Sequence, residues 1–222
     1  RNSQIFLVNL YVAEEIFVPT DYATIQAAVD AAMEGDVIIV SPGTYFENVD
    51  FKGKAITVRS EEPADWDIVN STIIKAKTIN QYSICVSFYH NEGPDSMLEG
   101  FTLINGAGAD ITYNYSYNST GYSCQYPGGG IFCLDSSPTI NRCMIRNNGG
   151  SESTGKKAYY GGGMALLGNC QAVISNCYII DNFAYNSGSA IFIRSSVPAL
   201  ATPTIRNCSI TYNNTYWPMS TS

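Results

Sequence analysis

Six charged residues between positions 110 and 181 have the side chains that metal-assisted proton chemistry would use. Carboxylates can hold a calcium ion, and a neighbouring basic residue can then abstract a proton from a bound substrate. These residues can approach one another if their loops gather on one side of the molecule. Scattered, solvated charges are the simpler interpretation, and the sequence favours it. The six residues are Asp110, Asp135, Glu152, Asp181, Arg146 and Lys156.

The chain has a single histidine, His90, in a polar bend. A lone exposed histidine is more often a surface residue than a catalyst. No serine–histidine–aspartate or cysteine–histidine arrangement is supported by the spacing. The sequence therefore predicts no metal site and no cofactor, with calcium as the exception if the acidic residues act together.

Seven cysteines make an odd number, so at least one stays unpaired or bonds to another chain. Cys143, Cys177 and Cys208 occupy the same position in three similar segments, and we expect them to form an inward stack of small apolar side chains. Directly stacked parallel positions give poor disulfide geometry. Cys124, in a long loop, can instead pair with Cys133 or with another subunit.

Tyrosines are dense in the loops that follow the similar segments. On a rigid scaffold such rings can stack on sugars or anchor a protein interface. They can equally pack the loops against the scaffold, and the sequence leaves both interpretations open. The predicted binding surface contains Tyr113, Tyr115, Tyr117, Tyr122, Tyr126, Tyr159 and Tyr160, with Tyr185 nearby.

The elements that position these residues form an internal repeat. The repeated segments are PTINRCMIRNN (138–148), AVISNCYIIDN (172–182) and PTIRNCSITYNN (203–214). A degenerate copy, SMLEGFTLING, places Phe101 at the cysteine position and Asn105 at the terminal asparagine. Glycine-rich motifs precede the three full copies, at 128–132, 161–165 and 188–192. Short strands joined by Gly and Asn corners predict a β-solenoid in which each coil stacks on its own copy in the next.

An amphipathic helix is predicted before the repeats. Ile25, Ala28, Val29 and Ala32 share one helical face, Asp21 or Thr24 can cap the start, and Gly35 suits the stop. Strand-like runs follow at once, so residues 18–60 are expected to cap the solenoid. We predict one β-helix domain over 18–222, with this cap, coils over 61–214 and a tail over 215–222, preceded by a separate segment, 1–17.

Composition limits the partners. The net charge is −7 and no basic stripe is present, which argues against nucleic-acid binding. No run is long and apolar enough to span a membrane. Asparagine sequons and the start at Arg1 favour an extracellular or cell-surface location. The predicted glycosylation sites are Asn70, Asn114, Asn118 and Asn213.

Both ends of the chain carry apolar side chains without an evident coil to join. A strand over residues 5–12 can pair within its own domain or add to a neighbouring subunit. Contact of the second kind is head-to-tail and produces a ring or filament, so we expect a homo-oligomer or homopolymer. The predicted subunit contacts are Ile5, Phe6, Leu7, Val8, Leu10, Val12, Tyr216 and Trp217.

The stretch TIQAAVDAAMEGDVIIVSPGTYFENVDFKGKAITV resembles the opening of pectin-lyase-like β-helix proteins. The later GGGI…SSPTINRC…N units resemble repeats of secreted β-helix proteins, and the Gly-Gly-x-Ile pieces are similar to polymorphic outer-membrane adhesins. The resemblance implies an all-β fold, a right-handed parallel β-helix with an N-terminal capping helix. It implies little about activity, because members of that superfamily differ widely in function.

Enzymes of the superfamily carry signatures that do not occur in this sequence. Pectin methylesterases use Gln-Asp-Thr and Arg-x-Trp motifs, and polygalacturonases use Asn-Thr-Asp and Arg-Ile-Lys. The leading hypothesis is therefore a non-enzymatic extracellular structural protein, self-assembling into a filament, sheath or surface layer, or adhesin-like. The alternatives are a carbohydrate-active enzyme of the polysaccharide-lyase type and a glycan-binding module.

Overall fold

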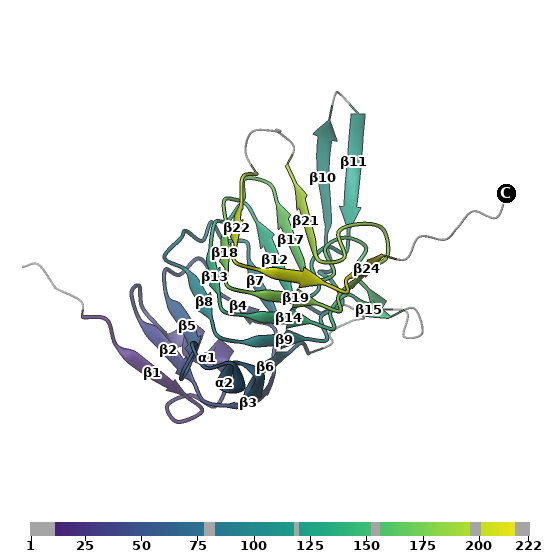
Figure 1. Ribbon diagram of the computed structural model, residues 1–222. Coiled ribbons are helices and arrows are strands. Elements are labelled where there is room, and N and C mark those ends of the chain that lie inside the picture. Colours follow the sequence, from purple (N-terminus) through teal and green to yellow (C-terminus); the bar gives the residue numbers. More distant parts are fainter. Residues whose placement is uncertain (1–11, 78–82, 118–119, 152–155, 196–200, 216–222) are drawn as a thin grey trace, which may run out of the picture.

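The computed structural model describes residues 12–77, 83–117, 120–151, 156–195 and 201–215. These residues form a solenoid of short parallel strands in three sheets, with successive coils rising from the N-terminal end (Figure 1). Each full coil contributes one strand to each sheet, in the order A, B, C along the chain. The predicted all-β parallel solenoid is confirmed.

The strands of the three sheets are as follows. Sheet A contains β1 (Glu15–Val18), β2 (Val37–Val40), β5 (Thr57–Ser60), β8 (Met97–Glu99), β13 (Thr139–Asn141), β18 (Val173–Ser175) and β22 (Thr204–Arg206). Sheet B contains β3 (Gly43–Phe46), β6 (Thr72–Lys75), β9 (Thr102–Ile104), β14 (Met144–Arg146), β19 (Tyr178–Ile180) and β23 (Ser209–Thr211). Sheet C contains β4 (Val49–Asp50), β7 (Val86–Phe88), β12 (Ile131–Leu134), β17 (Met164–Leu167) and β21 (Ile191–Arg194).

The core consists of identical side chains stacked from coil to coil. In sheet B, Ile145 lies opposite Ile179, which lies opposite Ile210. In sheet A, Ile140 and Ile174 are paired in the same way. Ile140, Ile145, Ile174 and Ile179 are fully buried. The sequence repeat is thus the consequence of a stack in which every inward position meets its own copy.

An asparagine ladder lines the corner between sheets B and C. Asn148 Nδ2 donates to Asn182 Oδ1 at 3.1 Å, and Asn182 Nδ2 donates to Asn213 Oδ1 at 3.0 Å. The same nitrogens donate to carbonyls of the coil below, as Asn182 Nδ2 does to Ile145 O at 2.8 Å. The ladder pairs buried polar groups that would otherwise destabilise the corner.

The degenerate copy joins this ladder through a glycine. The N–H of Gly106 donates to Asn148 Oδ1 at 2.9 Å. Asn105 corresponds instead to Asn147, and both have left-handed backbone, with φ of 68° and 53° respectively. The alignment that places Asn105 at the terminal asparagine is therefore wrong by one residue, because Gly106 holds that position.

The glycine motifs stand where backbones of successive coils cross too closely for a side chain. A Cβ on Gly129 would collide with the carbonyl oxygen of Gly162, and a Cβ on Gly162 would collide with that of Phe183. The next copy of the position is Ser189, whose Oγ lies 3.2 Å from Thr215 Oγ1. At this position the third motif therefore accommodates a Cβ, whereas the first two motifs do not.

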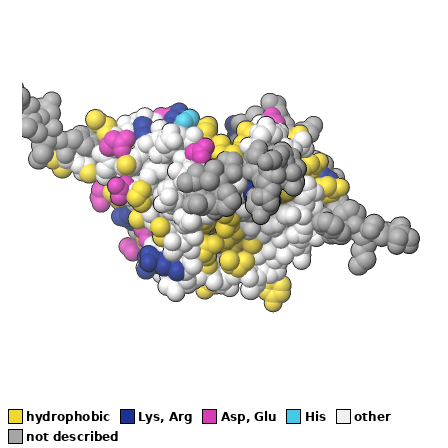
Figure 2. All heavy atoms as spheres, turned by 90° about the horizontal axis from the view of Figure 1, so that it is seen from above, with side chains coloured by type: hydrophobic (Ala, Val, Ile, Leu, Met, Phe, Trp, Pro, Cys, Tyr) yellow, Lys and Arg dark blue, Asp and Glu magenta, His cyan; other side chains and the backbone are white. Residues whose placement is uncertain are grey.

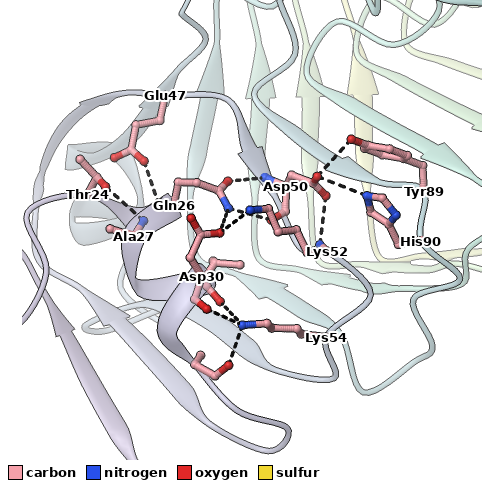
Figure 3. A network of polar contacts seen from close by, with 12 residues as sticks. Thr24, Gln26, Ala27, Asp30, Glu47, Asp50, Lys52, Lys54, Tyr89 and His90 are labelled. Atoms are coloured by element: carbon pink, nitrogen blue, oxygen red, sulfur yellow. Dashed lines mark hydrogen bonds and ion pairs between the residues drawn. The ribbon is translucent and has the colours of Figure 1, made fainter.

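Helix α1 (Ile25–Ala31) contacts β1, β2 and β4. Thr24 Oγ1 accepts from Ala27 N at 3.1 Å, and the Glu47 carboxylate accepts from the first two helical N–H groups at 3.0 and 2.9 Å. At the other end, Lys54 Nζ donates to three backbone carbonyls at 2.7, 2.8 and 2.7 Å (Figure 3). The helix is present where the pattern predicts it, and its role as a cap of the solenoid stays a prediction.

Two kinds of insertion interrupt the coils. Helix α2 (Trp66–Ser71) stands between β5 and β6, and Thr102 Oγ1 donates to its Val69 carbonyl at 2.9 Å. Between sheets B and C the loops carry antiparallel β10 (Thr112–Tyr117) with β11 (Thr120–Gln125), and β15 (Gly150–Ser151) with β16 (Lys156–Lys157). Parallel β20 (Phe183–Ala184) and β24 (Asn214–Thr215) pair at the same corner.

We predict that Asn182→Ala lowers the free energy of unfolding by about 2–4 kcal/mol, because it leaves buried ladder partners on both neighbouring coils unpaired. Exposed Asn169→Ala is the matched control and is expected to change stability by less than about 0.5 kcal/mol. Urea unfolding followed by circular dichroism measures both. Equal effects of the two substitutions would contradict the stabilising role of the ladder.

A second prediction concerns the crossing of backbones. Gly162→Ala is expected to destabilise the fold by about 3 kcal/mol or more, since a carbonyl oxygen occupies the site of the new methyl group. Ser189→Ala changes the same repeat position one coil further on and should cost about 1 kcal/mol or less. Thermal unfolding of the pair separates the two cases. A Gly162→Ala protein as stable as the parent would show that the crossing is not tight.

Candidate functional site

Three of the predicted tyrosines form a ladder along the corner between sheets B and C. The rings of Tyr126 and Tyr159 have centroids 5.2 Å apart at 79°, and those of Tyr159 and Tyr185 are 5.2 Å apart at 31°. Lys157 Nζ lies 3.7 Å from the centroid of the Tyr185 ring. All three rings are half-buried. Because the rings pack on one another, they hold the loops together. A ligand could contact only the part of each ring that stays exposed.

The other predicted tyrosines have different surroundings. Tyr160 packs on Phe192 with ring centroids 4.8 Å apart. Tyr113 packs against an apolar cluster that includes Phe132 on sheet C. Tyr115, Tyr117 and Tyr122 belong to β10 and β11, and their side chains lie outside the described residues. The predicted surface is therefore divided between a ladder and side chains that cover sheet C.

A pocket of about 490 Å³ lies at another corner, between sheets A and B. Trp66 of α2 forms one side, and the turns after β13, β18 and β22 form the rest. Its lining residues are Trp66, Arg142, Asn176, Cys177, Tyr178, Asn207, Cys208 and Ser209. We call it the Trp66 pocket.

The turn residues reach this pocket because of their backbone conformation. Arg142, Asn176 and Asn207 occupy one repeat position and have φ of 49°, 55° and 51°. Asparagine tolerates this left-handed region better than most residues. The bend lets the cysteine that follows each of them point into the core, while the turn residue itself stays at the surface. A column of polar side chains results, one from each coil.

Aromatic and polar groups face each other in the Trp66 pocket. The Trp66 and Tyr178 rings meet edge to face at 4.8 Å and 79°, and Tyr178 is 40% exposed. Arg142 Nη1 lies 3.2 Å from Glu99 Oε1. Asn176 Nδ2 donates to Asn141 Oδ1 at 2.8 Å. An apolar wall beside hydrogen-bonding groups held in place by their neighbours is suited to a ligand with one apolar face and several hydroxyl groups.

The pocket is not evident from the amino-acid sequence. Trp66 lies outside the repeats, and only the folded coils bring it over residues that are far away in sequence. The signal that was available is a tryptophan in an insertion, together with Arg142, Asn176 and Asn207 at the position before each stacked cysteine.

Two of the acidic candidates, Asp110 and Asp181, lie at the corner between sheets B and C, whereas Asp135 lies at the corner between sheets C and A. Asp135 follows β12, with a φ of 50°, and accepts from Asn169 N at 2.8 Å. Exposed Asp181 follows β19, exposed Asp110 precedes β10, and Arg146 lies on β14. Glu152 and the side chain of Lys156 fall outside the described residues. Within the described ranges, no group of three or more His, Cys, Asp or Glu residues is placed to hold a metal ion.

The histidine has a carboxylate neighbour. His90 Nε2 lies 3.4 Å from Asp50 Oδ2, to which Tyr89 OH also donates at 3.1 Å (Figure 3). Burial, with the Asp50 charge second, raises the pKa of Tyr89. Glu92, not identified from the sequence, is 2% exposed and accepts from Gly53 N and His90 N at 2.9 and 2.8 Å. These contacts join the turn after β4 to the turn after β7 in the next coil.

The repeated cysteines lie on the inner side of the turns. Cys143 and Cys177 are buried and Cys208 is half-buried. Cys177 Sγ donates to Ser175 O at 3.2 Å, and the hydrogen bond with the Cys143 thiol is the largest cause of the raised pKa of Cys177. All seven cysteines are free thiols. The sulfur next to Cys133 is that of Cys170, at 3.3 Å, and not that of Cys124 as the loop position suggests.

The remaining predicted sites divide into three groups. Asn70 and Asn114 are exposed, whereas Asn213 Nδ2 donates to Ile179 O at 2.8 Å within the ladder, which argues against a glycan there. Val12 is exposed and precedes β1. The other predicted contacts and Asn118 lie outside the described residues, namely Ile5, Phe6, Leu7, Val8, Leu10, Tyr216 and Trp217. No helix in the described part of the chain has the length and apolar character to cross a membrane.

Comparisons with known proteins bear on the fold. A family model described as a right-handed β-helix region matches residues 34–217. A search of curated proteins gives no match. Among solved structures, a pectin methylesterase from carrot is similar at 21% sequence identity with a TM-score of 0.43, and the match covers 82% of this chain and 55% of that one. The chain thus spans about half the length of that enzyme.

The family match covers most of the chain and all three repeated segments. It also supplies the handedness that the strand order alone leaves unstated, and the prediction of a right-handed parallel β-helix is confirmed. This chain belongs to the right-handed β-helix family.

Proposed function

We propose that this chain is a non-enzymatic, adhesin-like β-helix that acts outside the cell and binds a saccharide in the Trp66 pocket. The observation that carries the proposal is the pairing of Trp66 and Tyr178 at 4.8 Å beside a column of polar turn residues. A sugar ring has an apolar face of C–H groups, which rests on an aromatic ring, and hydroxyl groups around its edge, which bond to amides and guanidinium groups.

The scaffold supports this assignment because it is rigid. Arg142, Asn176 and Tyr178 follow or lie on strands that are paired on both sides, such as β18 between β13 and β22, while the rest of the rim follows β22, which is paired with β18. The polar rim is ordered by its own hydrogen bonds, including that between Asn207 Nδ2 and Asn176 Oδ1 at 3.5 Å. A preformed site loses little conformational entropy when a ligand binds.

The tyrosine ladder is the competing surface. Its rings already bury part of their area against one another, with Lys157 over the last ring. We assign it to loop packing and the Trp66 pocket to recognition. The lyase alternative has less support, since Asp135 lies at another corner than Asp110 and Asp181 and no three acidic groups among the described residues are placed to hold a metal ion. Calcium-dependent release of unsaturated uronate from an acidic polysaccharide would revive it.

Self-assembly is a second candidate function, favoured by the last described coil. Ile205 and Ile210 continue the inner stacks but are 38% and 45% exposed. Figure 2 shows hydrophobic side chains on this face, seen from above, while charged side chains gather toward the first coils. A second copy of the chain would cover these side chains by adding a coil in register.

We expect the protein to form filaments in negative-stain electron microscopy. Ile210→Asp should abolish the filaments, whereas the control Phe46→Asp, at another exposed site, should keep them. A protein that stays monomeric at all concentrations would contradict self-assembly.

We predict that Trp66→Ala weakens saccharide binding at least about ten-fold, because aromatic anchors dominate the energy of such sites. The chain has two tryptophans, so a Trp217→Phe protein reports on Trp66 alone. Its fluorescence is expected to change saturably when a panel of neutral and acidic oligosaccharides is titrated.

Two matched variants locate the site. Phe46→Ala removes another exposed aromatic side chain from sheet B, and Tyr159→Ala breaks the tyrosine ladder. Both should bind as the parent does. Loss of binding in Tyr159→Ala with full binding in Trp66→Ala would move the site to the ladder, and an absence of binding to the whole panel would refute the proposed function.

A further inference from the structure

Two buried thiols from different coils lie in contact. Cys133 is on β12 and Cys170 is in the turn that follows β17, the strand stacked on β12. Their sulfur atoms are 3.3 Å apart, and both side chains are fully buried. A disulfide has an S–S length of about 2.05 Å, so closing the bond needs a movement of roughly 1.2 Å, within the range of small side-chain rotations.

This pair differs from the other cysteines in register. Cys143 and Cys177 hold the same position in adjacent coils, an arrangement that suits disulfides poorly. Cys133, in contrast, stands opposite Leu166, and Cys170 reaches it diagonally from the turn beyond. The two thiols are therefore offset along the chain direction rather than stacked.

An oxidant can reach the buried Cys170 through local opening of the surface turn that carries it. Its sequence neighbours, Asn169 and Gln171, are exposed, so the cysteine is buried only by the inward direction of its side chain in a surface turn. Local opening of such a turn requires less free energy than unfolding of the coil. The hydrogen bond from Cys133 lowers the pKa of Cys170, which favours Cys170 as the attacking thiolate.

We propose that Cys133 and Cys170 form a disulfide when the protein meets a disulfide oxidant such as oxidised glutathione. The Cys170 thiolate attacks one sulfur of the oxidant, which forms a mixed disulfide and releases one glutathione thiolate. The Cys133 thiolate then attacks Cys170 Sγ and expels the second glutathione thiolate. The protein loses two protons and two electrons, and the oxidant is reduced to two thiols.

The bond would fasten the coil of β12 to the coil of β17 at the corner between sheets C and A. Such a link shortens the loops accessible to the unfolded chain, and its closure spans 37 residues of sequence separation. For a chain of this length we expect the oxidised form to melt about 10 °C higher than the reduced form. This proposal does not depend on saccharide binding.

The test uses the full chain, incubated with oxidised glutathione and then denatured with excess iodoacetamide. The expected product carries five alkylated cysteines, and non-reducing peptide mapping finds a Cys133–Cys170 cross-link. Cys143→Ser is the control that should keep the cross-link, while Cys170→Ser should lose it. The melting shift should be present in the parent and Cys143→Ser proteins and absent in Cys170→Ser.

Three results would overturn the proposal. Alkylation of all seven cysteines after oxidation would show that the pair does not close. A glutathione adduct on Cys170 without the cross-link would show that Cys133 cannot complete the exchange. Cross-links within Cys143, Cys177 and Cys208 in place of Cys133–Cys170 would assign the oxidisable pair to the stack.

Discussion

The hydrogen-bonded stacking of one coil on the next is the constraint on which the rest of this molecule depends. In a parallel β-helix each position meets its own copy, so a favourable contact is repeated and an unfavourable one is repeated as well. Apolar stacks such as Ile145, Ile179 and Ile210 gain from this repetition. Buried amides such as Asn182 also gain, because each one satisfies a neighbour above and below. Where backbones of successive coils come closest, only glycine fits, which explains the glycine motifs.

The same constraint explains where a binding site can arise. Inward positions are fixed by packing, and the backbones of the middle coils are paired on both sides, so variation in those coils is confined to turns and insertions. In the turn between sheets A and B, the position that can vary is the residue with left-handed backbone. Stacking of the coils arranges these residues, Arg142, Asn176 and Asn207, into a column. Helix α2 then places Trp66 against Tyr178 beside that column. Recognition thus needs no change to the core.

The fold was predictable because its signal is local and repeated. The Cys, Ile and Asn positions of the three segments give the strands, the inner stack and the corner in order. The degenerate copy was misaligned by one residue because Gly106 satisfies Asn148 with its backbone, which leaves no trace in side-chain type. The Trp66 pocket and the Cys133–Cys170 contact were missed for another reason. Both join residues at different repeat positions, and only the three-dimensional stack relates those positions.

The proposed function requires that the saccharide contacts the Trp66 pocket and not the tyrosine ladder. Nuclear magnetic resonance of the isotope-labelled chain tests it most directly, by following each backbone amide and the indole N–H as oligosaccharide is added. If the saccharide binds in the Trp66 pocket, the largest shifts are expected at the Trp66 indole and at the amides of Tyr178 and Ser209. Shifts centred on Tyr126, Tyr159 and Tyr185, with the pocket signals unmoved, would contradict it.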